Sequence, residues 1–173
     1  MDAEAEREFG DYVVARFGAL CRFAFLLCGD WHRAEDAVQT ALTKLYLRWD
    51  HLLDQGRIEP YLRRALVTSL IDEGRRGWFR KEAVHAQVPE VSEAGDSSVS
   101  TADRLALLAA LAQVPPRQRA VLVLRYWEDQ SIEQVADLLN CSTGTVKSQT
   151  AHGLQRLREL LGDRFTLSVG EVR

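Results

Sequence analysis

The chain has 173 residues, of which 46% are hydrophobic and 27% charged, and its formal net charge is -3. This composition can fill a folded core and excludes a chain that is disordered throughout. No apolar run approaches the roughly 18 residues of a membrane-spanning helix, so we expect no membrane partner. The first residues, MDAEAEREFGDY, lack the basic and then apolar segments of a signal peptide, which favours a cytoplasmic protein.

Helical periodicity dominates the N-terminal half. Apolar side chains recur at steps of one, three and four over residues 9–28, which predicts an amphipathic helix. Asp30 is a suitable N-cap for a second helix, which we expect over 34–53. A turn at 54–60 contains glycine and proline and separates it from a third helix, expected over 61–76.

The segment 82–103 has five acids and no lysine or arginine, which predicts a flexible acidic linker. Beyond it we expect a short helix over 104–112, another from Pro115 or Pro116 to Trp127, and a third over 132–139. Sustained alternation of apolar and polar residues is absent, so no sheet is expected. The predicted fold class is all-α, with two small helical modules joined by the linker.

The end of the second module has the pattern of a helix-turn-helix. Ser131 with Gln134 three residues later is a capping-box pattern, and Asn-Cys-Ser then forms a short turn into a last helix. A rotation of about 100° per residue separates two sides of that helix. The apolar side carries Val146, Thr150, Gly153, Leu154, Leu157 and Leu161, and the opposite side carries Ser148, Ala151, His152 and Gln155.

The polar side of this helix predicts a surface that reads duplex DNA. Residues 142–158 contain three cations and no acids. Short polar side chains suit base edges, and cations on both flanks suit phosphates. We assign to this contact Thr143, Thr145, Lys147, Ser148, Gln149, Ala151, His152 and Arg156. The alternative is an amphipathic helix with a solvated polar face, and the capped helix and short turn before it favour DNA binding.

Cys21, Cys28 and His32 fall at helical spacings of seven and four, a pattern compatible with a metal site. Zinc needs a further ligand, and none is evident nearby. Because cysteine is among the most buried residue types, we expect both cysteines in the core, with no metal or other cofactor. The four histidines lie apart without a nucleophile beside them, so we expect no enzymatic activity.

The two ends of the chain together resemble a bacterial RNA polymerase sigma factor of the sigma-70 family, in its extracytoplasmic-function (ECF) group and of the actinobacterial type. RAEDAVQTALTKLYLRWD and YLRRALVTSLIDEGRR resemble region 2 of the family, and VPPRQRAVLVLRYWEDQSIEQVADLLNCSTGTVKSQTAHGLQRLREL resembles region 4. The implied domains are region 2 at 1–81, the acidic linker at 82–103, region 4 at 104–161 and a tail at 162–173.

This resemblance implies a function in transcription initiation. Region 4 would read the -35 element as duplex through the residues assigned above, and region 2 would capture unpaired bases of the -10 element. The implied partners are the β and β′ subunits of core RNA polymerase, promoter DNA in duplex and single-stranded form, and, as a candidate, an anti-sigma factor.

Within the part that resembles region 2, residues 57–81 hold seven cations against three acids. A cationic track with aromatic platforms suits single-stranded DNA. The turn at 54–60 corresponds to the family's loop that receives a flipped base. The -10 contacts that we expect are Arg57, Tyr61, Arg63, Arg64, Thr68, Arg75 and Arg76.

The polymerase-binding surface is expected on the outward face of the second helix. It comprises Glu35, Asp36, Gln39, Thr40 and Thr43. Acidic and amide side chains suit a basic partner, and the resemblance places the family's polymerase contact here. Without the resemblance, a solvated helix face is the default interpretation.

Region 4 departs from many relatives at Gln149, where they carry arginine, and at His152-Gly153, where they carry Arg-Ala. Fewer fixed charges predict a weaker and less salt-sensitive -35 contact. Glycine in a helix interior costs up to about 1 kcal/mol relative to alanine, so Gly153 predicts a close approach of a neighbouring helix.

Two other classes of function remain open at this point. One is a stand-alone helix-turn-helix regulator whose N-terminal part is a sensor or dimerisation domain, although such a regulator would not need the track at 57–81. The other is an interaction protein, such as an adaptor or a sequestered inactive relative.

Overall fold

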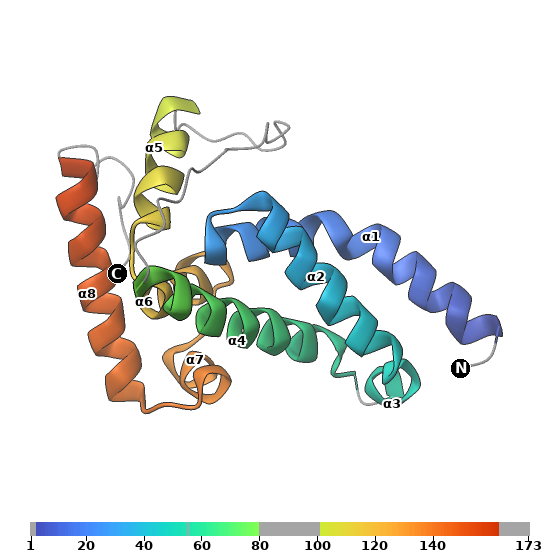
Figure 1. Ribbon diagram of the computed structural model, residues 1–173. Coiled ribbons are helices and arrows are strands. Elements are labelled where there is room, and N and C mark those ends of the chain that lie inside the picture. Colours follow the sequence, from blue (N-terminus) through green and yellow to red (C-terminus); the bar gives the residue numbers. More distant parts are fainter. Residues whose placement is uncertain (1–2, 55, 80–100, 163–173) are drawn as a thin grey trace.

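The computed structural model describes residues 3–54, 56–79 and 101–162, and in these ranges every regular element is a helix (Figure 1). The linker at 82–100 and the tail from residue 163 lie outside the described residues. The last three residues of the expected linker are helical, because Thr101, and not Arg104, begins the first helix of the C-terminal module. Asp103 lies in its first turn, where a carboxylate is favoured by the helix dipole.

The N-terminal module consists of four helices. They are α1 (Ala3–Cys28), α2 (Trp31–Tyr46), α3 (Trp49–Asp54) and α4 (Ile58–Phe79). The expected cap at Asp30 is confirmed, since its Oδ1 accepts a hydrogen bond from the Arg33 backbone N–H at 2.9 Å. α4 packs against both α1 and α2, so the module has a common apolar core.

The prediction of a single helix over 34–53 is wrong, because the helix is interrupted between Tyr46 and Trp49. Trp49 is only 3% exposed, and its ring lies 5.2 Å from that of Phe9 and 5.4 Å from that of Tyr12, centroid to centroid. The break leaves Leu47 exposed while Trp49 is buried against α1. Aromatic packing against a second helix therefore overrides the local helical periodicity.

The C-terminal module contains five further elements. They are α5 (Thr101–Ala112), α6 (Pro116–Leu122), η1 (Val123–Trp127), α7 (Ile132–Leu139) and α8 (Thr143–Leu161). The helix expected to continue to Trp127 widens into a π-helix at Val123, and the Glu128 N–H donates to the Val123 carbonyl at 3.0 Å. α5, α6 and α8 share a cluster of Ala110, Val114, Leu122 and Leu157.

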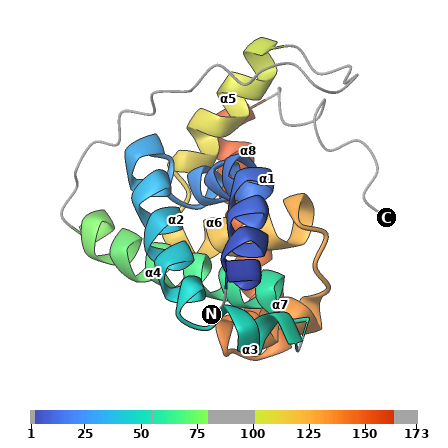
Figure 2. The same cartoon turned by 90° about the vertical axis from the view of Figure 1, so that its right-hand side faces the viewer.

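The two modules pack against each other in a contact that we call the junction. α4 contacts α1 and α2 of its own module and α6 and α7 of the other (Figures 1 and 2). One core cluster extends across both modules and includes Leu62, Leu66, Val121 and Val135. The sequence predicted the two modules but not their contact.

Arg119 is the polar centre of the junction. It is 4% exposed, and its guanidinium donates to the carbonyls of Ala112 at 2.6 Å, Val114 at 2.9 Å and Leu27 at 3.3 Å. Burial lowers the pKa of this guanidinium to about 10, so it stays charged at neutral pH. One cation therefore binds carbonyls at the ends of α1 and α5.

Two glycines allow the backbones at the junction to approach closely. A Cβ atom at Gly74 of α4 would lie 3.0 Å from Cγ of Pro116. A Cβ atom at Gly29 would lie 3.1 Å from the Ala112 Cβ, and Gly29 also has a positive φ of 72°. A larger side chain at either position would push the two modules apart.

Candidate nucleic-acid interface

The helix-turn-helix is confirmed by its caps. The Gln134 N–H donates to the Ser131 hydroxyl at 3.1 Å, and the Ser131 N–H donates to the Gln134 side chain at 2.7 Å. Asn140 follows α7 as its C-cap, and its left-handed φ of 50° turns the chain sharply. Ser142 then caps α8 by accepting from the Thr145 N–H at 3.1 Å.

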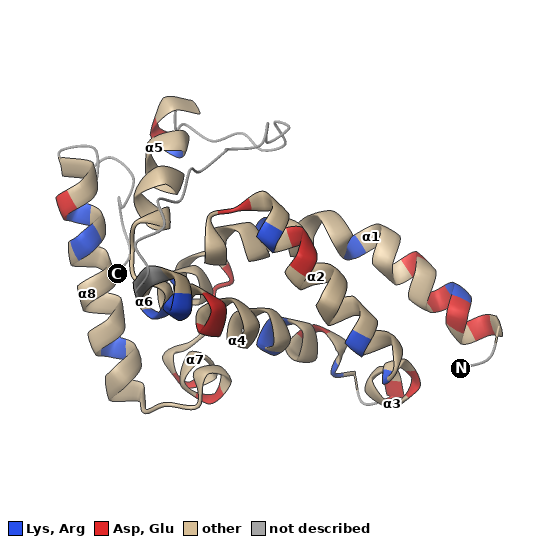
Figure 3. Ribbon diagram, in the orientation of Figure 1, with Lys and Arg blue, Asp and Glu red and all other residues tan. Residues whose placement is uncertain are grey.

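α8 has the two sides that the sequence predicted. Val146, Gly153 and Leu157 are buried. The opposite side is exposed, and we call it the recognition face: Lys147, Ser148, Ala151, His152, Gln155 and Arg156. In Figure 3 α8 runs along one edge of the molecule, with α1 and α2 on the other side. The recognition face is therefore uncovered by the rest of the described chain.

The residues assigned to -35 DNA differ in availability. Thr143, like the recognition face, is exposed, whereas Thr145 and Gln149 are half-buried. The Thr145 hydroxyl shares a hydrogen bond of 2.9 Å with the Ser142 hydroxyl, so it belongs to the helix cap. Arg156 forms an ion pair with Glu159 at 3.2 Å on the surface of α8.

Gly153 confirms the expected close approach. A Cβ atom at this position would lie 2.9 Å from Leu122 Cδ1 and 3.1 Å from Leu122 Cγ, both on α6. Real Cβ atoms do not come so close, so any side chain here would move α8 or the leucine. Gly153 thus allows α8 to pack closely against α6, and this contact sets the position of the recognition face relative to α6.

The residues assigned to -10 DNA follow α4 and the loop before it. Arg57, Thr68, Arg75 and Arg76 are exposed, and Tyr61 is half-buried with the Arg48 guanidinium 6.0 Å from its ring centroid. We call Arg57, Arg63, Arg64, Arg75 and Arg76 the cationic track. Arg80 and Lys81 lie outside the described residues.

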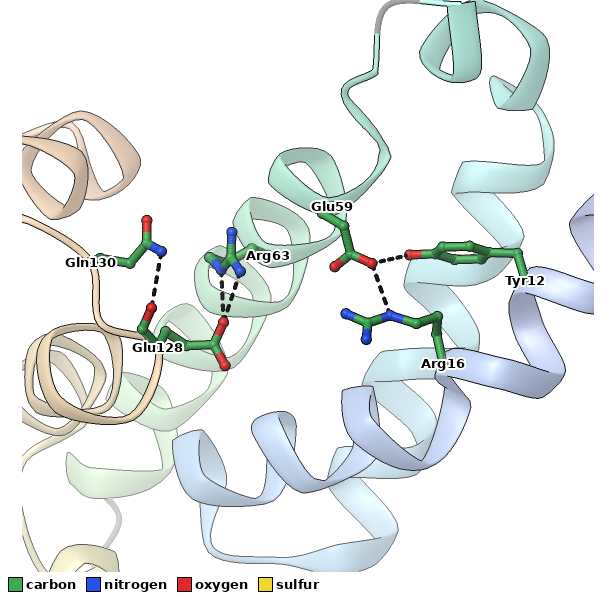
Figure 4. Close-up of polar contacts among 6 residues, drawn as sticks. All are labelled: Tyr12, Arg16, Glu59, Arg63, Glu128 and Gln130. Carbon is green, nitrogen blue, oxygen red and sulfur yellow. Dashed lines mark hydrogen bonds and ion pairs between the residues drawn. The ribbon is translucent and has the colours of Figure 1, made fainter.

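Arg63 and Arg64 of the cationic track face the other module. The Arg63 guanidinium donates to Glu128 Oε2 from Nε at 3.1 Å and from Nη2 at 2.8 Å (Figure 4). Arg64 Nη2 donates to the Asp137 backbone carbonyl at 2.9 Å. Neither partner was predicted, because Glu128 lies 65 positions from Arg63, Asp137 lies 73 positions from Arg64, and no local pattern connects them.

The start of α4 is tied to α1 through Glu59. Glu59 Oε1 accepts from the Tyr12 hydroxyl and from Arg16 Nε, each at 2.9 Å (Figure 4). Burial and the neighbouring Glu59 carboxylate raise the pKa of Tyr12 to about 12. These two hydrogen bonds hold the N-terminal end of α4 against α1.

The expected polymerase-binding residues lie on one side of α2. Asp36, Gln39, Thr40 and Thr43 are exposed, and Glu35 is half-buried. The Thr43 hydroxyl donates to the Gln39 carbonyl at 2.9 Å, an ordinary contact within a helix. The buried side of α2 carries Ala34, Val38, Ala41, Leu42 and Leu45. The surface is therefore open to a partner.

The cysteine and membrane expectations concern residues elsewhere in the chain. Cys21 and Cys28 are buried, as predicted, and burial raises the pKa of both thiols, that of Cys21 to about 11. In the described ranges no three potential ligands gather into a metal site. None of the helices described has both the length and the apolar character of a membrane span.

Comparison with known protein families matches the two modules separately. Residues 14–80 match the family model of sigma-70 region 2, and residues 104–157 match that of sigma-70 region 4. The RNA polymerase sigma-E factor of Streptomyces avermitilis is 41% identical over 161 residues, which is 91% of this chain and 87% of that protein. The chain belongs to the sigma-70 family of RNA polymerase sigma factors.

Further relatives place this sigma factor in the ECF group, actinobacterial type. The ECF RNA polymerase sigma factor SigL of Mycobacterium tuberculosis is 33% identical over 143 residues, 80% of each chain. The solved structure of the sigma factor RpoE of Bartonella quintana, in complex with the anti-sigma factor NepR, superposes with a TM-score of 0.66 at 25% identity, over 91% of this chain and 98% of that chain.

These comparisons support promoter-specific transcription initiation as the function of this sigma factor. They also favour it over a stand-alone helix-turn-helix regulator, because the N-terminal module matches region 2 and not a sensor or dimerisation domain.

Proposed function

We propose that this sigma factor joins core RNA polymerase through α2, reads the -35 element with the recognition face of α8, and captures the -10 strand with the cationic track. The observation that carries the proposal is the recognition face. Its short polar side chains lie between Lys147 and Arg156 on the exposed side of a capped helix. This is the geometry of a helix that enters the major groove.

The -10 role is supported by the chemistry of the loop and of α4. Arg57 lies in the loop before α4, and Tyr61 offers an aromatic ring one turn further on. Bases that leave the stack gain such contacts only when they are unpaired, so binding favours strand opening. The protein would then act by binding alone, without enzymatic activity or a cofactor.

The partner of α2 would be a basic surface on the β and β′ subunits of core polymerase. The exposed Asp36 and Gln39 are supporting observations, because acidic and amide groups complement a basic coil. We accordingly propose that the protein acts in the cytoplasm, where polymerase and promoters are found. By analogy with the RpoE complex, we also propose an anti-sigma factor as a regulatory partner.

A run-off transcription assay tests the proposed function. Purified full-length protein is added to core RNA polymerase on a pool of templates that carry candidate upstream regions. We expect transcripts that begin at defined positions and that require the protein. The absence of any such transcript, with a known sigma factor active in the same reaction, would refute the proposal.

The -10 assignment has a separate test in the holoenzyme. Arg63→Glu combined with Arg64→Glu should impair promoter melting more than duplex binding at -35, because both residues belong to the cationic track. Permanganate footprinting reports the melted bubble. Arg104→Glu, at an exposed position of α5, is the control. An unchanged bubble in the double variant would contradict the assignment.

A further inference from the structure

The two edges of the recognition face differ in fixed charge. A rotation of about 100° per residue places Lys147 and Arg158 along one edge of α8, and Gln149 and Arg156 along the other. The second edge, which we call the Arg156 edge, thus carries one arginine, and this arginine is paired with Glu159 at 3.2 Å. The Arg156 edge therefore offers less positive charge to a DNA phosphate than the opposite edge does.

His152 lies beside the Arg156 edge, one turn after Ser148 and one turn before Arg156. Its side chain is exposed, and none of the described residues forms a hydrogen bond with the imidazole. Side chains four residues apart on a helix have Cβ atoms about 5–6 Å apart. His152 and Arg156 therefore face the same stretch of a DNA strand bound along this edge.

The elements packed on α8 contact its other side. α5, α6 and α7 meet the apolar side of the helix, through Ala110, Leu122 and Val135. The charged residues of these elements are Asp103 and Arg104 on α5, Arg117 and Arg119 on α6, and Glu133 and Asp137 on α7.

The charged residues of α8 itself are Lys147, Arg156, Arg158 and Glu159. Glu159 is the one acid within this helix, and Arg156 already binds it. The acceptor that an imidazolium at His152 would meet on this side is therefore a phosphate of bound DNA.

Histidine differs from the other charged residue types of α8, because its charge changes near neutral pH. Carboxylates, lysine and arginine ordinarily keep their charge between pH 6 and pH 8, whereas an ordinary imidazole passes from mostly protonated to mostly neutral. A nearby phosphate favours the imidazolium, because an opposite charge favours the charged form of a titratable group. Protonation and DNA binding are therefore coupled wherever an imidazole meets a phosphate.

We propose that His152 makes duplex binding by the recognition face depend on a proton. In the complex a ring N–H of the imidazolium donates to a phosphate oxygen on the Arg156 edge, and the proton comes from the solvent. Affinity for duplex DNA then rises as the pH falls, because the proton supplies a cation that this edge otherwise lacks. The inference rests on the proposed -35 role of the recognition face.

The pH dependence of duplex affinity tests the proposal in the full-length protein. A short rhodamine-labelled duplex of mixed sequence is titrated at low salt, and fluorescence anisotropy gives its Kd. The wild type should bind about fivefold more tightly at pH 6 than at pH 8. The fall of log K with log salt should also be steeper at pH 6, by up to about 0.9, because one more phosphate is neutralised.

Two substitutions of His152 separate its proton from other effects of pH. His152→Gln is polar but cannot be protonated, so its affinity should match that of the wild type at pH 8 and vary less than about twofold with pH. His152→Arg carries a permanent charge, so at pH 8 it should bind as tightly as the wild type at pH 6. Because the position is exposed, both variants should keep the helix content of the wild type, measured by circular dichroism.

His32→Gln, at an exposed position of α2, is the matched control and should keep the full pH dependence. An affinity of the wild type that is equal at pH 6 and pH 8 would overturn the proposal. So would a pH dependence that persists in His152→Gln, or one that His32→Gln abolishes as well.

Lys147→Glu separates failure of this inference from failure of the proposed function. If the recognition face does not bind duplex DNA, Lys147→Glu leaves the affinity unchanged at both pH values, and the -35 role is wrong. If only the proton dependence is wrong, Lys147→Glu still weakens binding at both pH values, but the wild type and His152→Gln respond to pH alike.

Discussion

The recognition face of α8 and the cationic track along α4 both carry exposed cations, yet their surroundings differ. α8 meets its own module through the apolar side alone, and its polar side is exposed. α4 is covered on two sides, and two of its arginines bind the C-terminal module. Charge that is equally visible in the sequence is thus not equally available to DNA.

The difference has a physical origin in the two helices. α8 is amphipathic, with small and polar residues on the side away from the core. α4 also buries Val67 and Ile71, in addition to Leu62, Leu66 and Leu70. A helix with so wide an apolar surface must pack on more than one neighbour. The junction follows from that requirement, and the arginines beside it acquire partners as a result.

The largest effect is expected from substitution of Arg119, the buried cation of the junction. Arg119→Met would leave the carbonyls of Leu27, Ala112 and Val114 buried without their donor. The free energy of unfolding should fall by about 3 kcal/mol, measured by urea denaturation. Arg104→Met, on an exposed part of α5, should change it by less than about 0.5 kcal/mol. Equal stability of both variants would show that the junction contributes little.

Charge reversal on α8 asks whether the recognition face acts independently of α4. Lys147→Glu should weaken binding to duplex DNA about tenfold and reduce its dependence on salt, because a phosphate contact is lost. Single-strand binding should stay within about twofold. Fluorescence anisotropy over a salt series measures both, with Lys44→Glu on exposed α2 as the control. An equal loss of affinity for duplex and single-stranded DNA would show that the recognition face and the cationic track do not act independently.

The seating of α8 can be altered without a change of charge. Gly153→Ala should lower the free energy of unfolding by about 1 kcal/mol, since contact with Leu122 outweighs the better helix propensity of alanine. Gly10 lies at an exposed position of α1, where an added Cβ atom meets nothing within 4 Å. Gly10→Ala should therefore raise the free energy of unfolding by about 0.5 kcal/mol. Thermal or urea denaturation compares the two variants, and stabilisation by both substitutions would contradict the close packing of α8 on α6.

The smallest effect concerns the acid on α8 itself. Glu159 pairs with Arg156 at 3.2 Å, but both side chains are about half exposed, 52% and 45%. Glu159→Gln should therefore tighten duplex binding only about twofold at low salt, and the gain should vanish as salt screens the charges. The same anisotropy assay measures it. A gain above about fivefold, or one that persists at high salt, would contradict an exposed and weakly held pair.

The helices that carry their own start and stop signals could be predicted from the sequence. Ser131, Gln134 and Asn140 fix the first helix of the helix-turn-helix through local hydrogen bonds, and the two sides of α8 follow from its period. The close packing at Gly153 was also predictable, because glycine destabilises a helix interior and a close neighbour explains its presence there.

The features that depend on distant packing could not be predicted. The break before Trp49 arises because the indole packs between Phe9 and Tyr12. The Arg63–Glu128 pair depends on how the modules meet, and no local pattern encodes that. Val67 and Ile71 were the available signal, since they widen the apolar surface of α4 beyond the stripe that one neighbour needs.

The π-helix gives the junction an unusual dependence on backbone length. In η1 the Glu128 N–H reaches back five residues to the Val123 carbonyl, one more than in an α-helix. Deleting one residue from this turn would restore the ordinary period and rotate the helix end by about 100°. Both members of the Arg63–Glu128 pair would survive such a deletion, but the carboxylate would point elsewhere. A one-residue deletion in this short stretch would thus remove the Arg63–Glu128 ion pair from the junction although neither residue is substituted.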